Sequence, residues 1–332
     1  MTSESSAVIA DAAPLTAPVM EEIRARVSLV CTEAEGVVSL EFVPEDADTF
    51  PDWQAGAHID VVMGPELVRQ YSLCSDPADR HHWRIAVLRE PKSRGGSEFI
   101  HTQINVGDVL VLRGPRNHFP LLPAQEYVLV AGGIGITPIL TMAEELERQG
   151  KNWKLLYGGR SENSMAFTKL LKRHGERVCI RPEDRFGLLD LTSWVGESRA
   201  QCLVYCCGPE RLLQALEQVC ADWPEESVQI ERFRAADEAA LVQDGSFDVI
   251  LAKSNMTVHI DEGRAIADVL EEAGVYIPRS CNEGSCGTCI TKVLDGEPDH
   301  RDSFLRGKMR ENNKHIMVCC SRAKTKTITL NV

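Results

Sequence analysis

The chain has 332 residues, 43% of them hydrophobic, and a formal net charge of −13. This length predicts two or three domains, each able to bury a core without disulfide bonds. The acidic balance argues against a nucleic-acid partner. No stretch approaches the roughly 18 consecutive apolar residues that a membrane helix needs.

The N-terminal segment and the cysteines indicate where the protein works. Residues 1–19 are small, acidic and contain proline, without the basic start of a signal peptide, so we expect a disordered extension. Four of the twelve cysteines form one C-terminal group, and the others are scattered through apolar segments. This distribution does not suit a secreted disulfide framework. It suits a reducing cytoplasm and a single metal site.

Residues 20–123 alternate short apolar runs with turn signals, which predicts an antiparallel β-barrel. One short helix, Ser97–Ile104, is expected among the strands, with Ser97 as its N-cap. The expected strands are Arg26–Cys31, Gly36–Val43, His58–Met63, Arg69–Leu73, Trp83–Arg89 and Asp108–Arg113.

Two segments of this barrel could hold a flavin. Along the strand 69–73, alternate side chains share one face and offer a guanidinium for phosphate and a ring for stacking. The segment 89–97 puts basic residues and glycines before a helix N-terminus, which suits a phosphate. The alternatives are an ordinary strand and a solvated basic loop. The candidates are Arg69, Gln70, Tyr71, Ser72, Leu73, Arg94, Gly95, Gly96 and Ser97.

Residues 124–233 alternate strands with helices, which predicts a doubly wound parallel sheet of the α/β class. The expected strands are Tyr127–Ala131, Trp153–Tyr157, Val178–Arg181 and Cys202–Cys206. The expected helices are Pro138–Arg148, Met165–Lys172 and Glu210–Cys220.

A nucleotide site is expected where these strands end. The glycine-rich turn 132–138 would let the backbone approach a pyrophosphate at a helix N-terminus. The turn 207–209 follows another strand, in the usual ligand crevice of such sheets, with a small core residue as the less favoured alternative for Cys207. Arg160 could bind a 2′-phosphate, cover the adenine, or lie in solvent. The candidates are Gly132, Gly133, Gly135, Thr137, Pro138, Arg160, Cys207, Gly208 and Pro209.

Residues 234–245 are polar and rich in alanine, which predicts a linker before a third domain, 246–332. That domain is expected to open with a hairpin-like pair of strands and a helix, and to close on an edge strand. The expected elements are Phe247–Lys253, Met256–Asp261, Ala265–Ala273 and Thr327–Val332.

The strongest motif of the chain is a set of cysteines with the spacing C-x₄-C-x₂-C and a fourth further on. Cys281, Cys286, Cys289 and Cys319 match the ligand pattern of plant-type [2Fe–2S] ferredoxins. Glycines inside the loop give it the conformational freedom to wrap a cluster, whereas zinc motifs rarely use this spacing. Because Cys319 and Cys320 would face opposite sides of a strand, only one can be a ligand, and the pattern favours Cys319.

Together these motifs resemble the phthalate dioxygenase reductase family, within the ferredoxin–NADP⁺ reductase superfamily. The resemblance covers the chain from about residue 20 onward and includes the order barrel, nucleotide domain, ferredoxin. It implies an α+β β-grasp ferredoxin domain, FMN, NADH and a Rieske-type oxygenase as protein partner. It also implies that Phe233 lies at the flavin and that Gly133, Thr137 and Cys207 line the nicotinamide path. Cys207 and Ser72 are the expected catalytic residues.

The three cofactors predict an electron-transfer enzyme. NADH gives up two electrons as hydride, an iron–sulfur cluster takes one at a time, and a flavin can do both, so it must stand between them. We therefore expect the reductase component of an oxygenase. Two alternatives remain at this point, namely a reductase for another acceptor such as a cytochrome, and a redox sensor that reuses these domains.

Overall fold

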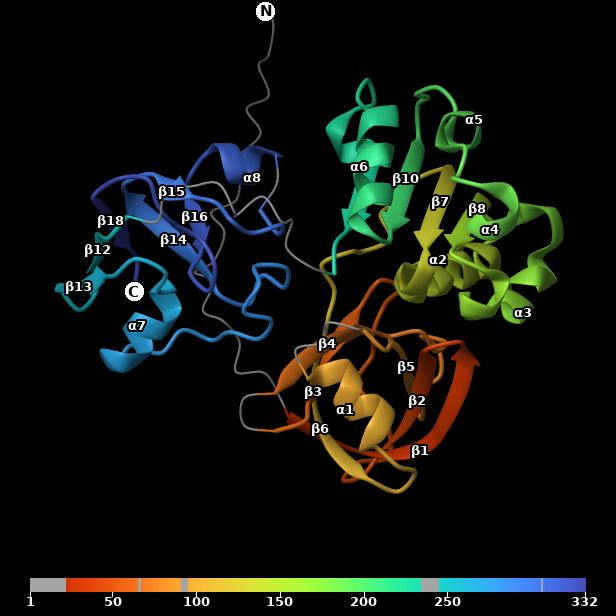
Figure 1. The fold of residues 1–332 in the computed structure, drawn as a ribbon, viewed down its shortest axis with the longest axis horizontal. Coiled ribbons are helices and arrows are strands. Elements are labelled where there is room, and N and C mark those ends of the chain that lie inside the picture. Colours follow the sequence, from red (N-terminus) through yellow and green to blue (C-terminus); the bar gives the residue numbers. More distant parts are fainter. Residues whose placement is uncertain (1–21, 65–66, 91–94, 234–244, 306) are drawn as a thin grey trace, which may run out of the picture.

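The chain forms three parts in a computed structural model, each built around its own β-sheet (Figure 1). The structure describes residues 22–64, 67–90, 95–233, 245–305 and 307–332. The predicted extension 1–19 and all but the last residue of the predicted linker lie outside the described residues.

The first part is a barrel of six strands, which confirms the antiparallel architecture expected from the sequence. Its strands are β1 (Glu22–Ala34), β2 (Val37–Pro44), β3 (His58–Val62), β4 (Val68–Ser72), β5 (Trp83–Leu88) and β6 (Val109–Arg116). They pair in the order β4-β3-β6-β1-β2-β5, and a bridge between Leu73 and Ile85 joins the two edges. The inner faces bury a core in which Phe50 stacks on Trp83, with ring centroids 4.2 Å apart.

The helix of the barrel, α1 (Gly96–Thr102), begins differently from the prediction. Its N-cap is Gly95, with a φ of 90°, and Ser97 lies inside the first turn. The Oγ of Ser97 instead accepts a hydrogen bond from the backbone N–H of Glu90 at 3.1 Å. The expectation that Ser97 caps the helix is therefore wrong, because the left-handed backbone at the cap position favours glycine.

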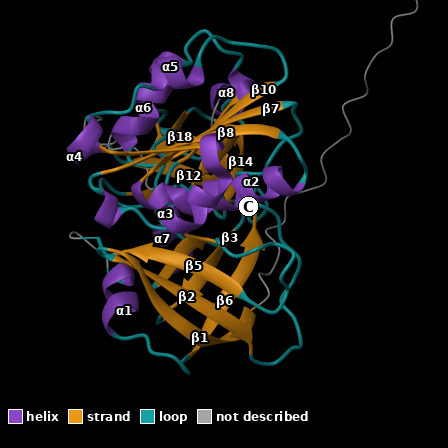
Figure 2. Cartoon of the chain, turned by 90° about the vertical axis from the view of Figure 1, so that its right-hand side faces the viewer, coloured by secondary structure: helices purple, strands orange, loops and turns teal. Residues whose placement is uncertain are grey.

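The second part is a parallel sheet with helices on both faces, as predicted. Its strands β7 (Glu126–Gly132), β8 (Asn152–Gly159), β9 (Val178–Pro182), β10 (Cys202–Cys207) and β11 (Val228–Glu231) lie in the order β11-β10-β7-β8-β9. Helices α2 (Ile136–Arg148) and α3 (Thr168–Leu171) pack on one face, and α5 (Leu191–Val195) and α6 (Glu210–Val219) on the other (Figure 2). The short elements β11, α5 and α4 (Glu183–Phe186) were not predicted, because so few residues carry little periodicity.

The third part is an α+β unit around a mixed sheet, with the strand order β13-β12-β18-β14-β16. Its elements are β12 (Phe247–Leu251), β13 (Met256–Ile260), α7 (Ile266–Glu272), β14 (Ile290–Asp295), β15 (Pro298–Asp299), α8 (Gly307–Glu311), β16 (His315–Met317), β17 (Arg322–Ala323) and β18 (Thr327–Leu330). The expectation of an edge strand at the end of the chain is wrong. Strand β18 is central, since it pairs with β12 on one side and with β14 on the other.

The barrel and the parallel sheet share one hydrophobic core. Val37, Ala55 and Ala86 of the barrel are buried in the same cluster as α2 and the inner face of β7 and β8. Tyr205 of β10 ties the connecting segment to the sheet, because its hydroxyl accepts from the N–H of Leu122 (2.7 Å) and donates to the carbonyl of Pro120 (2.9 Å). These contacts fix the two parts against each other.

Candidate functional site

The four predicted metal ligands lie together in the third part. Cys281, Cys286 and Cys289 belong to the loop between α7 and β14, and Cys319 follows β16. All four side chains are buried. The loop can wrap so tightly because Gly284 and Gly287 have positive φ angles of 71° and 75°.

The thiols form two pairs. The thiol of Cys286 is in hydrogen-bond contact with that of Cys281, and Cys289 with Cys319, and these contacts together with burial raise the pKa values of Cys286 and Cys289. Two pairs suit two irons with two cysteines each, whereas a tetrahedral zinc site gathers its ligands around one centre. The donor set therefore fits a [2Fe–2S] cluster.

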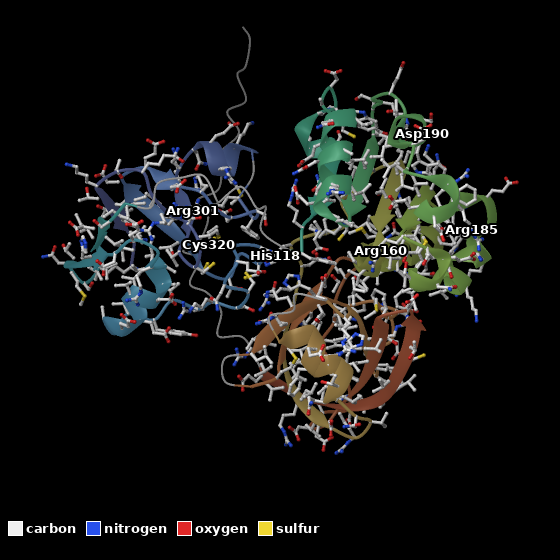
Figure 3. All side chains as sticks on the ribbon, viewed as in Figure 1. His118, Arg160, Arg185, Asp190, Arg301 and Cys320 are labelled. Atoms are coloured by element: carbon white, nitrogen blue, oxygen red, sulfur yellow. The ribbon has the colours of Figure 1, made fainter. Side chains whose placement is uncertain are left out.

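Two backbone amides of the cluster loop face ligand thiols, and Cys320 packs against the same loop. The N–H of Glu283 points at Sγ of Cys281 (3.3 Å), and the N–H of Thr288 at Sγ of Cys286 (3.5 Å), as a charged cluster requires. Cys320 (Figure 3) makes other contacts: its Sγ lies 3.8 Å from the carbonyl oxygen of Met317 and packs against Gly284, where a Cβ would stand 2.4 Å from it. The geometry thus favours Cys319 as the fourth ligand and leaves Cys320 as a packing residue.

The two predicted flavin segments come together on the barrel. The side chain of Arg69 lies across Gly96 in the first turn of α1, so close that a Cβ on Gly96 would stand 2.4 Å from Cγ of Arg69. A guanidinium and the helix start thus adjoin, as expected of a phosphate site. Tyr71 packs against the barrel core, and burial raises the pKa of its hydroxyl. Arg94 lies outside the described residues.

The side chains of β4 alternate as predicted, and Gln70 points away from Arg69 and Tyr71. Its Nε2 donates to Oδ1 of Asp60 (3.1 Å) and to Oγ of Ser280 (3.4 Å), the residue before the first cluster cysteine. Ser72 is buried opposite His58 in the strand register, and Leu73 is fully buried, so its side chain serves the core.

The glycines of the nucleotide turn divide into two kinds. A Cβ on Gly135 would lie 2.3 Å from the carbonyl oxygen of Cys207, and one on Gly132 would lie 2.7 Å from Cδ of Pro209. These two glycines let the ends of β7 and β10 touch, at the point where the strand order reverses. Gly133, with a φ of 54°, faces open space, because a Cβ placed there would meet nothing within 4 Å. Its backbone is the one free to approach a pyrophosphate.

Other predicted nucleotide residues differ in their exposure. Cys207 is completely buried, and burial, with the nearby Glu231, raises the pKa of its thiol well above the ordinary value. Thr137 is buried, and its hydroxyl donates to the carbonyl of Ile134 at 3.0 Å. The remaining candidates vary, with Pro138 buried, Gly208 partly buried, and Pro209, Arg160 and Phe233 exposed.

Sequence reasoning missed a buried polar group behind β4. Asp60 is fully buried and forms a double ion pair with Arg116, one branch of which measures 3.1 Å. His58 is buried beside it, and desolvation, then the charge of Arg116, lowers its pKa well below 6.5. A carboxylate inside an otherwise apolar strand was the available signal, because such a group needs a partner.

Comparisons with known proteins agree with this geometry. Residues 249–324 match the family model described as a 2Fe-2S iron-sulfur cluster binding domain. The chain is 39% identical to phenoxybenzoate dioxygenase subunit beta of Ectopseudomonas oleovorans, over 95% of this chain and 99% of that one. It is 36% identical to phthalate dioxygenase reductase of Burkholderia cepacia, over 90% of this chain and 94% of that one.

Solved structures show the same arrangement. The structure described as phthalate dioxygenase reductase, a modular structure for electron transfer from pyridine nucleotides to [2Fe-2S], matches with a TM-score of 0.71 and 34% identity, over 94% of this chain and 98% of that one. An intact type IV self-sufficient cytochrome P450 monooxygenase matches with a TM-score of 0.85 and 42% identity, over 94% of this chain. The chain spans only 41% of that monooxygenase. Among the described residues, no helix is long and apolar enough to cross a bilayer.

Proposed function

This chain belongs to the phthalate dioxygenase reductase family, and from that premise we propose that it passes electrons to a Rieske-type oxygenase. It is an NADH-dependent iron–sulfur flavoprotein oxidoreductase with FMN and a [2Fe–2S] cluster as cofactors. Relatives are named as parts of dioxygenase and monooxygenase systems, which supports an oxygenase as the partner. The Rieske type of that partner rests on the resemblance alone.

The chain would use residues of all three parts to place these cofactors. Arg69 and the first turn of α1 would bind the FMN phosphate, and Tyr71 and Ser72 would hold the ring system. Gly133, Thr137 and Cys207 would line the nicotinamide path, where a thiol with a raised pKa stays neutral and adds no charge. The corresponding domains would be 20–123, 124–233 and 246–332.

The bound cofactors would supply the chemistry, with FMN converting two-electron donation by NADH into the single-electron transfers that a [2Fe–2S] cluster accepts. The protein's task is placement, so no general base is needed. The observation that carries the proposal is the contact between Gln70 and Ser280, because it joins the strand of the predicted flavin site to the loop of the cluster cysteines.

A second candidate acceptor is a cytochrome. The similarity to a self-sufficient cytochrome P450 monooxygenase, of which this chain spans 41%, supports that alternative. We favour the separate oxygenase because phenoxybenzoate dioxygenase subunit beta and phthalate dioxygenase reductase are matched over nearly their full length. We also propose that the protein works in the cytoplasm, since all twelve cysteines are free.

The test is an anaerobic titration of the purified protein with NADH, followed by visible absorption. Bleaching of both the flavin and the iron–sulfur bands is expected, and subsequent transfer to an added Rieske oxygenase would identify the acceptor. A flavin that bleaches beside a fully loaded cluster that stays oxidised would contradict the proposal. Transfer to a cytochrome P450 but not to any Rieske protein would select the alternative.

A further inference from the structure

We propose that His118 of the barrel and Phe304 of the third part form a dock that positions the cluster loop against the flavin strand. Both are positioning residues for the electron step between the two cofactors, and neither belongs to the predicted cofactor-binding set. The inference rests on the proposed function and extends it to the interface between two parts of the chain.

The first half of the dock is a row of rings. His118 stacks on His58 with ring centroids 5.4 Å apart, and it meets Phe304 in an edge-to-face contact with ring centroids 5.1 Å apart. His58 lies opposite Ser72 of the predicted flavin strand. Figure 3 places His118 where the barrel approaches the third part. The row therefore runs from the flavin strand to the neighbouring part.

Phe304 is fixed to the cluster loop at two points. Its backbone N–H donates to the carbonyl oxygen of Gly284 at 3.1 Å. Its ring covers Gly287, where a Cβ would stand 2.4 Å from Cζ of Phe304. Both glycines lie between cluster cysteines, so a displacement of Phe304 moves the loop that carries them.

The second half of the dock is polar and anchored deep in the barrel. Asp60 is fully buried, is held by Arg116, and accepts from Nε2 of Gln70. The same Nε2 reaches Oγ of Ser280, which precedes Cys281. A buried ion pair that is hydrogen-bonded through both carboxylate oxygens holds its two side chains in one geometry. The start of the cluster loop is thus fixed to the barrel framework, while Phe304 fixes its middle.

The two halves have a common effect on the reaction. They hold the loop with its cysteines beside β4, although the third part shares no hydrophobic cluster with the barrel among the described residues. Without such a core, the fraction of molecules with the loop in place depends on a few contacts. The observed rate of electron transfer to the cluster is proportional to that fraction.

The experiment uses the anaerobic holoenzyme mixed rapidly with NADH, with flavin and cluster absorbance followed separately. We expect His118→Ala to slow cluster reduction by about three- to tenfold, as expected for loss of one aromatic contact, while flavin reduction keeps its rate. His118→Phe should restore cluster reduction, because it keeps the ring. Phe304→Leu probes the dock from the other side, and His82→Ala is a matched control on the barrel surface, paired there with Asp79.

Hydrogen–deuterium exchange of residues 280–289 provides a readout independent of turnover. Faster exchange in His118→Ala than in His82→Ala is expected. Unchanged cluster reduction and unchanged exchange in His118→Ala would overturn the dock, as would an equal slowing of flavin reduction. If the wild-type holoenzyme itself fails to pass electrons to its cluster, the proposed function falls, and the role of the dock falls with it.

Discussion

The barrel meets its two neighbours in different ways. Toward the parallel sheet it shares a continuous hydrophobic core, reinforced by the backbone hydrogen bond from the N–H of Glu35 to the carbonyl of Asn163 at 2.8 Å. Toward the third part, the described residues show a ring contact and a polar contact, with separate hydrophobic cores on each side.

The two interfaces of the barrel suit two different reactions, hydride transfer and single-electron transfer. Hydride transfer needs reacting atoms at about 3–3.5 Å, so the parts predicted to hold nicotinamide and flavin must be rigid relative to each other. A single electron crosses a longer gap, and the cluster must also reach an acceptor on another protein. A shared core therefore suits the first interface, and a small dock suits the second. Four predictions test this contrast, from the largest expected effect to the smallest.

Loss of one cluster ligand should separate the two reactions completely. In Cys319→Ser we expect no stable cluster and no electron delivery to an oxygenase, while NADH still reduces the flavin at the wild-type rate. The matched variant Cys320→Ser should keep the cluster, because that thiol packs outside the ligand set. Iron content and visible spectra of both variants provide the measurement. A cluster lost in Cys320→Ser and kept in Cys319→Ser would reverse the ligand assignment.

A single methyl group added at Gly56 should disrupt the interface between the barrel and the parallel sheet. A Cβ there would stand 2.0 Å from the carbonyl oxygen of Phe119, at a φ of +89°. We expect Gly56→Ala to lower the free energy of unfolding by about 3 kcal/mol and to slow flavin reduction. Gly107→Ala is the matched control, because Gly107 has a similar φ of +99° but open space around it. It should cost about 1 kcal/mol, measured by urea unfolding. Equal losses in both variants would refute the close-contact argument.

The tyrosine that ties the connecting segment to the sheet should contribute less. In Tyr205→Phe, the N–H of Leu122 and the carbonyl of Pro120 lose their partner. We expect a loss of about 1–2 kcal/mol in thermal or urea unfolding, with slower flavin reduction and unchanged cluster spectra. If Tyr205→Phe slowed only cluster reduction, Tyr205 would act at the interface with the third part, and this prediction would be wrong.

Acid should weaken the dock while the shared core remains intact. Burial, then the charge of Arg116, lowers the pKa of His58 well below its ordinary 6.5, whereas His118 is more exposed and its pKa is lowered by partial desolvation and the same charge. The unfolded chain therefore binds more protons, so stability is complete above about pH 6.5 and falls as the pH drops through the lowered values. Exchange at residues 280–289 should rise below that pH, and less so in His118→Phe. If exchange at residues 280–289 rose equally in the wild type and in His118→Phe, the acid effect would belong to groups other than His118.

The sequence predicted the local features of this molecule well. Strands and helices with a clear period were found, and the spacing of Cys281, Cys286 and Cys289 alone indicated the cluster, because these ligands lie within one loop. The fourth ligand stays a prediction: the ferredoxin pattern favours Cys319, but Cys319 and Cys320 lie in a turn after β16, so the strand alternation expected there does not apply. The assignments of flavin and nucleotide residues stay predictions, although the structure brings Arg69 to Gly96 and Gly132 to Gly208.

Features that depend on distant residues were not predictable. Strand β18 was expected at an edge, but its neighbours β12 and β14 come from far earlier in the chain. Gln70 and Ser280 are 210 residues apart, so no local pattern connects them. The nucleotide glycines looked alike in sequence, and only the packing of Cys207 against Gly135 separates a structural glycine from the open Gly133.

The central place of β18 has a consequence for how the protein is made. Domains fold as they emerge from the ribosome, N-terminal parts first. The barrel and the parallel sheet can fold while the third part is still being synthesised. The third sheet lacks its middle strand until Thr327–Leu330 have emerged, so its cysteine loop has no complete scaffold before then. The order of assembly is therefore set by the chain itself: the barrel and the parallel sheet can form first, and the cysteine loop gains its complete scaffold only after the middle strand of its sheet has been translated.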